Sequence, residues 1–86
     1  MKKVLDFYAP WCGPCKAAEK TILETAKGLG LNVEKVNVED SRPLFEEFGV
    51  KTVPTLVVID GSSEIGRLSG AVLTKERLTE FFSRHC

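Results

Sequence analysis

The sequence predicts an α/β fold in which a four-stranded mixed sheet is flanked by three helices, in the order βαβαββα. Short apolar runs alternate along the chain with segments of helical periodicity, which is the pattern of such a fold. Residues 56–59 are apolar throughout, as expected for a central strand covered on both faces. Asp60 and Gly61 form a turn signal directly after it, so the next strand should return antiparallel. With 86 residues, the chain is expected to be one domain, 1–86.

The first half of the chain begins with residues 4–8, an apolar and aromatic run that predicts a buried strand. A helix is expected to begin near Cys12 or Gly13. Pro14 suits its first turn, where a backbone N–H would have no partner within the helix. Apolar residues then recur at helical spacing until Gly28, which is expected to end the helix.

The second half contains the remaining elements. Residues 33–38 predict a second strand, and Asp40 or Ser41 is expected to cap a short helix after it. Because both strand-to-strand connections contain a helix, we expect two βαβ units with parallel pairing and right-handed crossovers. Residues 64–68 predict the returning strand, and Thr74 is expected to cap the last helix.

Composition excludes several classes of function. The formal net charge is zero, the isoelectric point is about 6.6, and Lys and Arg form no dense block. Electrostatic attraction therefore gives no reason to expect a nucleic acid or membrane partner. No apolar run approaches the roughly 20 residues of a membrane span. The start of the chain lacks the long apolar segment of a signal peptide, so a cytoplasmic location is expected.

Cys12 and Cys15 are two of the three cysteines, and their position in the predicted fold indicates that their thiols take part in a reaction. Cys12 follows the carboxyl end of a buried strand and precedes the first turn of a helix, where free N–H groups and the helix dipole favour a thiolate. Cys15 lies one turn further along and begins the inward-facing stripe, so it should be the more buried of the two. An exposed, ionised sulfur beside a buried, protonated one suits thiol–disulfide exchange.

Two other interpretations of the pair are weaker. A structural zinc site usually takes four ligands, and the further candidates, His85 and Cys86, are adjacent at the end of the chain. A structural disulfide between Cys12 and Cys15 would close a very small loop and stabilise little. We therefore expect redox chemistry, with no metal and no bound cofactor.

Two segments carry a family resemblance: DFYAPWCGPC at residues 6–15 and KTVPTLVVIDG at residues 51–61. Both resemble the thioredoxin family, and the likeness runs from the first strand to the last helix. It implies a thioredoxin-like fold and a protein-disulfide reductase that acts in redox homeostasis. It also implies disulfide-containing protein substrates, a thioredoxin reductase flavoenzyme as electron donor, and a monomer.

The resemblance assigns roles around the cysteines. It implies that Cys12 is the nucleophile and that Cys15 is the resolving thiol. Gly13 and Pro14 match the intervening pair of the reducing members of the family. Trp11 matches the residue that flanks the site and packs beside Cys12.

The resemblance also singles out two charged residues. Asp6 matches a buried acid below Cys15. It interrupts an apolar strand, and because burial raises the pKa of a carboxyl group, it could accept the Cys15 proton. The alternative is a solvated residue on the outer face of the strand. Lys35 matches a lysine that approaches this acid, and the alternative is an ordinary surface lysine.

A third set of residues is expected to border the substrate groove. Pro54 resembles a cis proline that faces the cysteines. A proline that opens a central strand leaves an unpaired edge, where the Val53 backbone could pair with an extended substrate. Gly70 resembles a glycine beside the same groove, and the alternative is an ordinary turn glycine. The expected apolar surface around Cys12 consists of Ala9, Trp11, Val53, Pro54, Gly70 and Ala71.

The sequence departs from the family in ways that leave alternatives open. Tyr8 stands where many thioredoxins have Trp, and the compact outline resembles that of glutaredoxins. Residues 66–70 lack the glutaredoxin glycine pair, so glutathione is not favoured. The alternatives are a glutathione-dependent oxidoreductase and a non-enzymatic docking subunit that uses the rim around Trp11. Cys86 is expected to be an exposed thiol without a role, with an intermolecular disulfide as its alternative.

Overall fold

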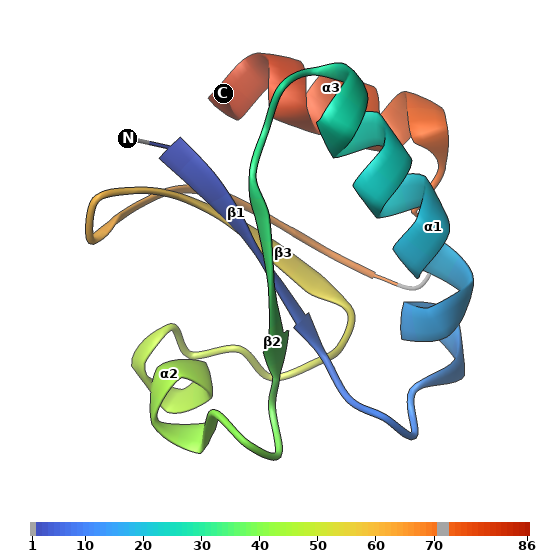
Figure 1. Ribbon diagram of the computed structural model, residues 1–86. Helices are drawn as coiled ribbons and strands as arrows, with labels where there is room; N and C mark the ends of the chain where they lie inside the picture. Colours follow the sequence, from blue (N-terminus) through green and yellow to red (C-terminus); the bar gives the residue numbers. More distant parts are fainter. Residues whose placement is uncertain (1, 71–72) are drawn as a thin grey trace.

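The computed structural model describes residues 2–70 and 73–86 (Figure 1). Its elements confirm the predicted order and fold class. They are β1 (Lys2–Tyr8), α1 (Gly13–Gly28), β2 (Val33–Asn37), α2 (Arg42–Glu47), β3 (Thr55–Asp60), β4 (Ser63–Ser69) and α3 (Lys75–His85).

The four strands form one mixed sheet in the order β2-β1-β3-β4. β1 and β2 are parallel, as predicted, and β3 and β4 form the expected antiparallel pair. β3 is antiparallel to β1, so the expectation of a second parallel βαβ unit is wrong. α2 has six residues and is therefore only about 9 Å long. It stays at the edge where β2 ends and does not return the chain to the opposite edge (Figure 1).

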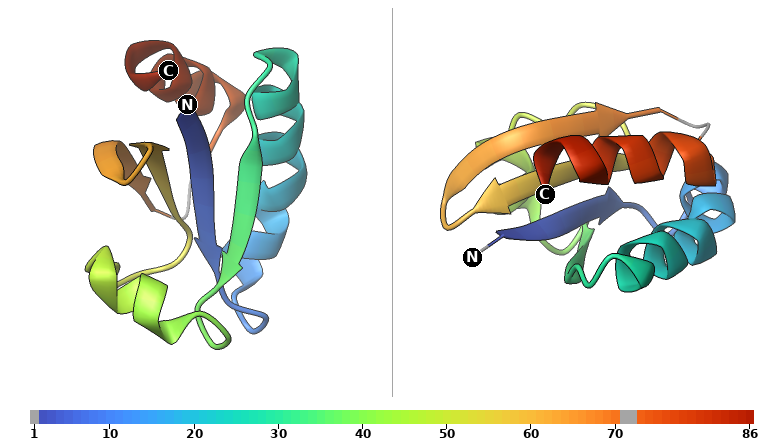
Figure 2. Two further views of the ribbon diagram at one scale, coloured as in Figure 1. Left: turned by 60° about the vertical axis from the view of Figure 1, so that its left-hand side comes forward. Right: turned by 90° about the horizontal axis from the view of Figure 1, so that it is seen from above.

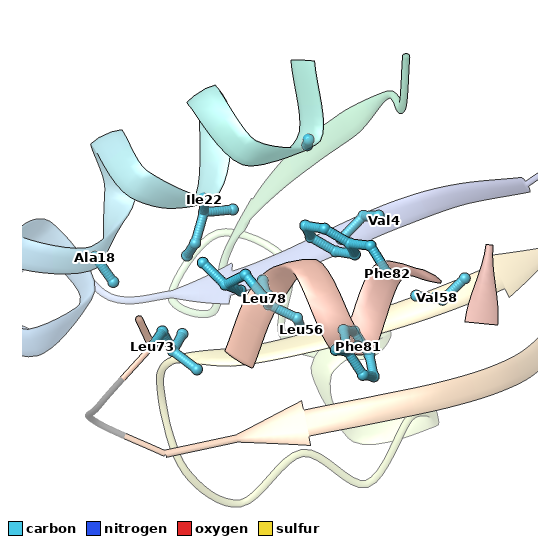
Figure 3. Packing of buried hydrophobic residues seen from close by; sticks show 10 residues of the cluster. Val4, Ala18, Ile22, Leu56, Val58, Leu73, Leu78, Phe81 and Phe82 are labelled. Atoms are coloured by element: carbon cyan, nitrogen blue, oxygen red, sulfur yellow. The ribbon is translucent and has the colours of Figure 1, made fainter. Parts of the chain in front are cut away.

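The helices lie on both faces of the sheet, with α1 and α3 on one face and α2 on the other (Figure 2). Side chains alternate along β1, so that Val4 points to the α1/α3 face while Leu5 and Phe7 point to the α2 face. The core of the α1/α3 face is the larger one, and Figure 3 shows its packing. Its buried members are Val4, Ala18, Ile22, Ala26, Leu56, Val58, Leu73, Leu78, Phe81 and Phe82.

The helix starts follow local sequence signals. The Thr74 hydroxyl accepts a hydrogen bond from the Arg77 N–H at 3.2 Å, which confirms the predicted cap of α3. Ser41 occupies the cap position of α2 but makes no capping hydrogen bond through its side chain. Among the helices of residues 2–70 and 73–86, none has the length and apolar character needed to cross a bilayer.

The sheet register brings distant segments together at one edge. Phe7, near the end of β1, is paired with Thr55, the first residue of β3. The turn after β1 and the segment before β3 therefore lie at the same edge, where α1 also begins. At the opposite edge, the Lys2 ammonium group donates a hydrogen bond to the backbone oxygen of Cys86 at 3.5 Å.

Candidate active site

Cys12 and Cys15 form a disulfide across the start of α1, with their Cα atoms 5.3 Å apart. Cys12 is the N-cap residue of the helix, and its Sγ accepts a hydrogen bond from the Cys15 N–H at 3.1 Å. The Cys12 N–H is itself bonded to the Ala9 oxygen at 3.1 Å, which fixes the turn after β1. The sulfur therefore lies at the positive end of the helix dipole, an environment that favours negative charge on it.

Both cysteines are buried in this oxidised form. Cys12 is 3% exposed and Cys15 is 5% exposed, so the expectation that Cys12 is clearly the more exposed is wrong for this state. The reason is non-local, because Val38 and Val53, from segments far along the chain, pack against the cluster that Cys12 and Cys15 form with Ala9. Trp11, by contrast, is 70% exposed directly beside Cys12.

A groove lies next to Trp11, on the side of α2. It has a volume of about 360 Å³, and its lining is apolar apart from Lys51 and Thr52. The lining residues are Trp11, Val38, Phe45, Lys51, Thr52 and Val53. Gly13 and Pro14 lie exposed next to Trp11 in the first turn of α1. Sequence reasoning singled out Trp11 and Val53 but missed the other four residues. Val38 and Phe45 come from separate parts of the fold, whereas Lys51 and Thr52 directly precede Val53 and could have been found from it.

Pro54 directly precedes β3 and follows Val53, which packs against the cluster of Ala9, Cys12 and Cys15. The Val53–Pro54 peptide bond is cis, and Pro54 is buried. The Gly70 N–H donates a hydrogen bond to the Pro54 oxygen at 3.3 Å. Gly70 has φ of 134°, a conformation that favours glycine. Ala71, expected on the same surface, lies outside the described residues.

Asp6 lies on β1, on the side that faces α1, and is 3% exposed. The solvated alternative for this residue is therefore wrong. Burial raises the pKa of Asp6 to about 6, and the nearby positive charge of Lys35 acts in the opposite direction. A small cavity of about 50 Å³ is lined by both Asp6 and Cys15. The structure thus brings the Asp6 carboxyl group and Cys15 to the same small cavity.

Lys35 lies opposite Asp6 in the parallel pairing of β1 and β2. Its ammonium group forms an ion pair with Glu19 of α1 and lies 4.4 Å from the centre of the Tyr8 ring. Glu19, Lys35 and Tyr8 all line the small cavity. Sequence reasoning missed Glu19, although a residue four positions after Cys15 lies on the same helix face.

The model of the thioredoxin family matches residues 1–84 of the sequence. The chain belongs to the thioredoxin family. It is 37% identical over 84 residues to the thioredoxin of Haemophilus influenzae, covering 95% of this chain and 78% of that protein. It is 36% identical over 83 residues to the Bacillus subtilis thioredoxin, with 93% and 78% covered.

Solved thioredoxin structures agree with this assignment. The X-ray structure of Fasciola hepatica thioredoxin superimposes with a TM-score of 0.88 at 32% identity, over 99% of this chain and 81% of that one. The germline-specific thioredoxin Deadhead of Drosophila melanogaster gives a TM-score of 0.87 at 33% identity, over 96% and 79%. The thioredoxin-like fold expected from the sequence is confirmed.

Thioredoxins are thiol–disulfide oxidoreductases that act on disulfide substrates, and this member has its Cys12–Cys15 pair at disulfide distance. The pair is therefore the redox-active disulfide of a reductase that works by thiol–disulfide exchange. This result favours the reductase interpretation over both the glutathione-dependent enzyme and the docking subunit.

The third cysteine of this thioredoxin lies away from the redox pair. Cys86 contacts Lys2 at the start of β1, whereas Cys12 follows the end of that strand. Cys86 is an exposed free thiol, and its pKa is raised by partial burial, with Lys2 acting in the opposite direction. Within residues 2–70 and 73–86, no three side chains of His, Cys, Asp or Glu are grouped so that they could hold a metal ion.

Proposed function

We propose that Cys12 is the nucleophile of this reductase and that Cys15 resolves the mixed disulfide. The observation that carries the proposal is the position of the Cys12 sulfur at the helix cap, where it accepts the Cys15 N–H. Opening the disulfide leaves this sulfur next to a donor and a helix dipole, both of which stabilise a thiolate. A thiolate is the form that attacks a disulfide.

The reaction proceeds in two exchanges. The Cys12 thiolate attacks one sulfur of the substrate disulfide, and the other substrate sulfur leaves as a thiolate and takes a proton from water. Asp6 then removes the proton of Cys15, whose thiolate attacks Cys12. The Cys12–Cys15 bond forms, the bond from Cys12 to the substrate breaks, and the second substrate sulfur leaves as a thiolate. This thiolate takes a proton from water, and Asp6 returns its proton to solvent. Two electrons pass from the protein dithiol to the substrate.

Asp6 suits the role of proton acceptor because it lines the same small cavity as Cys15. A pKa raised to about 6 brings the carboxyl group closer to the neutral range in which a general base is most effective. Lys35 is placed opposite Asp6 and carries the nearest compensating charge. In this scheme Lys35 tunes the acid and does not itself exchange a proton with the cysteines.

The substrate is a protein whose disulfide lies in an accessible, extended segment. Trp11, Gly13 and Pro14 contact it on one side of Cys12, and Val53, Pro54 and Gly70 contact it on the other. Support comes from the large exposed indole and from the apolar groove between Trp11 and Val53. Trp is among the residues that most often contribute strongly to binding when they become buried at an interface.

The proposal extends to the cellular setting. Residues 1–86 act as one domain and as a monomer in the cytoplasm, and a thioredoxin reductase flavoenzyme restores the dithiol. No bound cofactor takes part. Membership of the thioredoxin family and the balanced charge of the chain support this setting.

Reduction of insulin disulfides by dithiothreitol tests the assignment. The parent protein and Cys86→Ser should accelerate the reaction equally, and Cys12→Ser should give only the uncatalysed rate. If Cys12→Ser were as active as the parent, the nucleophile would be wrongly assigned. Replacing dithiothreitol by NADPH with a thioredoxin reductase should sustain turnover, whereas glutathione with glutathione reductase should not.

A further inference from the structure

Lys35 lines the same small cavity as two carboxylate residues, Asp6 and Glu19, and its ammonium group pairs with the more exposed one. Glu19, its ion-pair partner, has a side chain that is 40% exposed. Asp6, opposite Lys35 across the strand pairing, is buried. Among residues 2–70 and 73–86, the structure contains no ion pair between Lys35 and Asp6. The Tyr8 ring provides a second contact for the ammonium group, 4.4 Å from the ring centre.

We propose that Glu19 is a positioning residue that holds the Lys35 ammonium group on the solvent side of the small cavity, away from the Asp6 carboxyl group. The inference rests on the proposed role of Asp6 as the proton acceptor. Glu19 does not touch the reacting sulfurs. It acts through Lys35, because the ion pair competes with the attraction between Lys35 and the buried acid.

The surroundings of Asp6 leave few other charges that could set its proton affinity. From α1, Cys15, Lys16 and Glu19 line the cavity. From the strands, Tyr8 and Lys35 line it. On β3, the residue paired with Asp6 is the apolar Leu56. Among these groups, the positive charge of Lys35 acts on Asp6 and lowers the pKa of its carboxyl group.

The position of Lys35 therefore decides how strong a base Asp6 is. Burial alone raises the pKa of Asp6, and an ammonium group in direct contact would cancel much of that rise. With Lys35 held by Glu19, Asp6 keeps a pKa of about 6 and a higher affinity for the Cys15 proton. With Lys35 on Asp6, the carboxylate would be a weaker base, and resolution of the mixed disulfide would slow at neutral pH.

The direct test is a titration of the Asp6 carboxyl carbon by NMR in the oxidised protein, in which neither Cys12 nor Cys15 titrates. Glu19→Gln should lower the pKa of Asp6 by about one unit, because an opposite charge at close range lowers a carboxyl pKa by roughly 1–3 units. Glu24→Gln is the matched control, since Glu24 is an exposed glutamate on the same helix. An unchanged Asp6 midpoint in Glu19→Gln, or an equal shift in Glu24→Gln, overturns the proposal.

Loss of the Glu19 charge could also act on Asp6 directly, without any movement of Lys35. The same titration in a Lys35→Met background separates the two routes. If Glu19 acts through Lys35, then Glu19→Gln should leave the Asp6 midpoint unchanged in that background. If the full shift persists there, the positioning role is wrong. Rescue of the parental midpoint by Glu19→Asp would add further support for the ion pair.

A kinetic measurement separates failure of this inference from failure of the proposed function. The rate at which Cys15 resolves a Cys12–peptide mixed disulfide is followed from pH 5 to pH 9. Glu19→Gln should move the acid limb of the profile to lower pH and reduce the plateau severalfold. If the Asp6 midpoint shifts and the profile does not, Glu19 positions Lys35 but Asp6 is not the proton acceptor. If Asp6→Asn slows resolution while Glu19→Gln moves no midpoint, the proposed function stands and this inference fails.

Discussion

The two faces of the sheet are covered to different extents. On the α1/α3 face, the two longer helices pack on the sheet around a core that includes ten buried residues among those described, and Leu78 and Phe82 are completely inaccessible. On the α2 face, the single six-residue helix has no buried residue of its own, and Phe45 and Phe48 are only partly covered. The α1/α3 face, which we call the closed face, holds the buried Asp6 beside Cys15. The α2 face, which we call the open face, carries the groove beside Trp11. If the proposed roles of Asp6 and Trp11 hold, stability and proton handling belong to one face and substrate contact to the other.

The largest expected effect tests whether the closed face dominates stability. Phe82→Ala should lower the free energy of unfolding by about 3–5 kcal/mol, because it removes a fully buried aromatic ring and leaves a cavity. Phe45→Ala, on the open face, should cost clearly less, since that ring is already partly solvated. Urea denaturation followed by circular dichroism measures both values. Equal losses of unfolding free energy in the two variants would contradict the view that the closed face contributes more to stability.

The second effect concerns how much the burial of the Asp6 carboxylate lowers the free energy of unfolding. The pKa of Asp6 is about 6 in the folded protein against an ordinary value of 3.8, so the folded state binds more protons between these values. The free energy of unfolding therefore falls as pH rises from about 4 to about 6, and it stays lowered above that range. Asp6→Asn, which mimics the protonated acid, should stabilise the protein by about 3 kcal/mol at pH 8.

At pH 4 the same substitution should change stability little, because Asp6 is then already protonated when folded. Denaturation curves of parent and Asp6→Asn at the two pH values provide the measurement. A gain that is equal at both pH values would mean that packing, and not the buried charge, explains the effect of the variant.

The third effect tests whether the open face contacts the substrate. Trp11→Ala should raise KM for a protein disulfide about tenfold, which corresponds to about 1.4 kcal/mol of binding. The free energy of unfolding should not change, since the indole is largely exposed. Ile65→Ala removes another exposed apolar side chain on β4 and serves as the control in the same kinetic assay. Similar KM values for Trp11→Ala and the parent would contradict the assignment of the groove.

The smallest effect compares the starts of two helices on opposite faces. Thr74→Ala should destabilise the protein by about 1 kcal/mol, because the hydroxyl of Thr74 caps α3. Ser41→Ala should cost less than about 0.5 kcal/mol, because the Ser41 side chain makes no capping bond in α2. Thermal unfolding of the two variants in parallel provides the measurement, and a larger loss for Ser41→Ala would contradict it.

Local signals in the sequence predicted much of the fold. The apolar run of β3, the turn at Gly61 and the cap at Thr74 depend on neighbouring residues, and each was found where expected. The direction of β3 relative to β2 could not be predicted in this way. It depends on α2 remaining at one edge of the sheet, which follows from packing and not from the pattern of either strand.

The candidate site, like the fold, could be predicted where it depends on neighbouring residues and was missed where it depends on distant ones. The cysteine pair and its place at the start of α1 follow from adjacent residues and could be predicted. The burial of Cys12 was missed because Val53, which packs against the cluster that contains Cys12, is about forty positions away in the sequence. Glu19 was missed for the same reason, since its partner Lys35 lies on β2, a separate element of the fold. For Asp6, the family resemblance pointed to a burial that the period of a short strand alone left open.

The contact between Lys2 and Cys86 has a consequence for how this domain can be attached to other molecules. Both described ends of the chain emerge at one edge of the sheet, and the disulfide lies at the other. A fusion partner, an affinity tag or a solid support joined at this edge would leave the reactive edge facing outward. The Cys86 thiol is exposed there, so it also offers a point for oriented immobilisation that does not block clients from reaching Cys12.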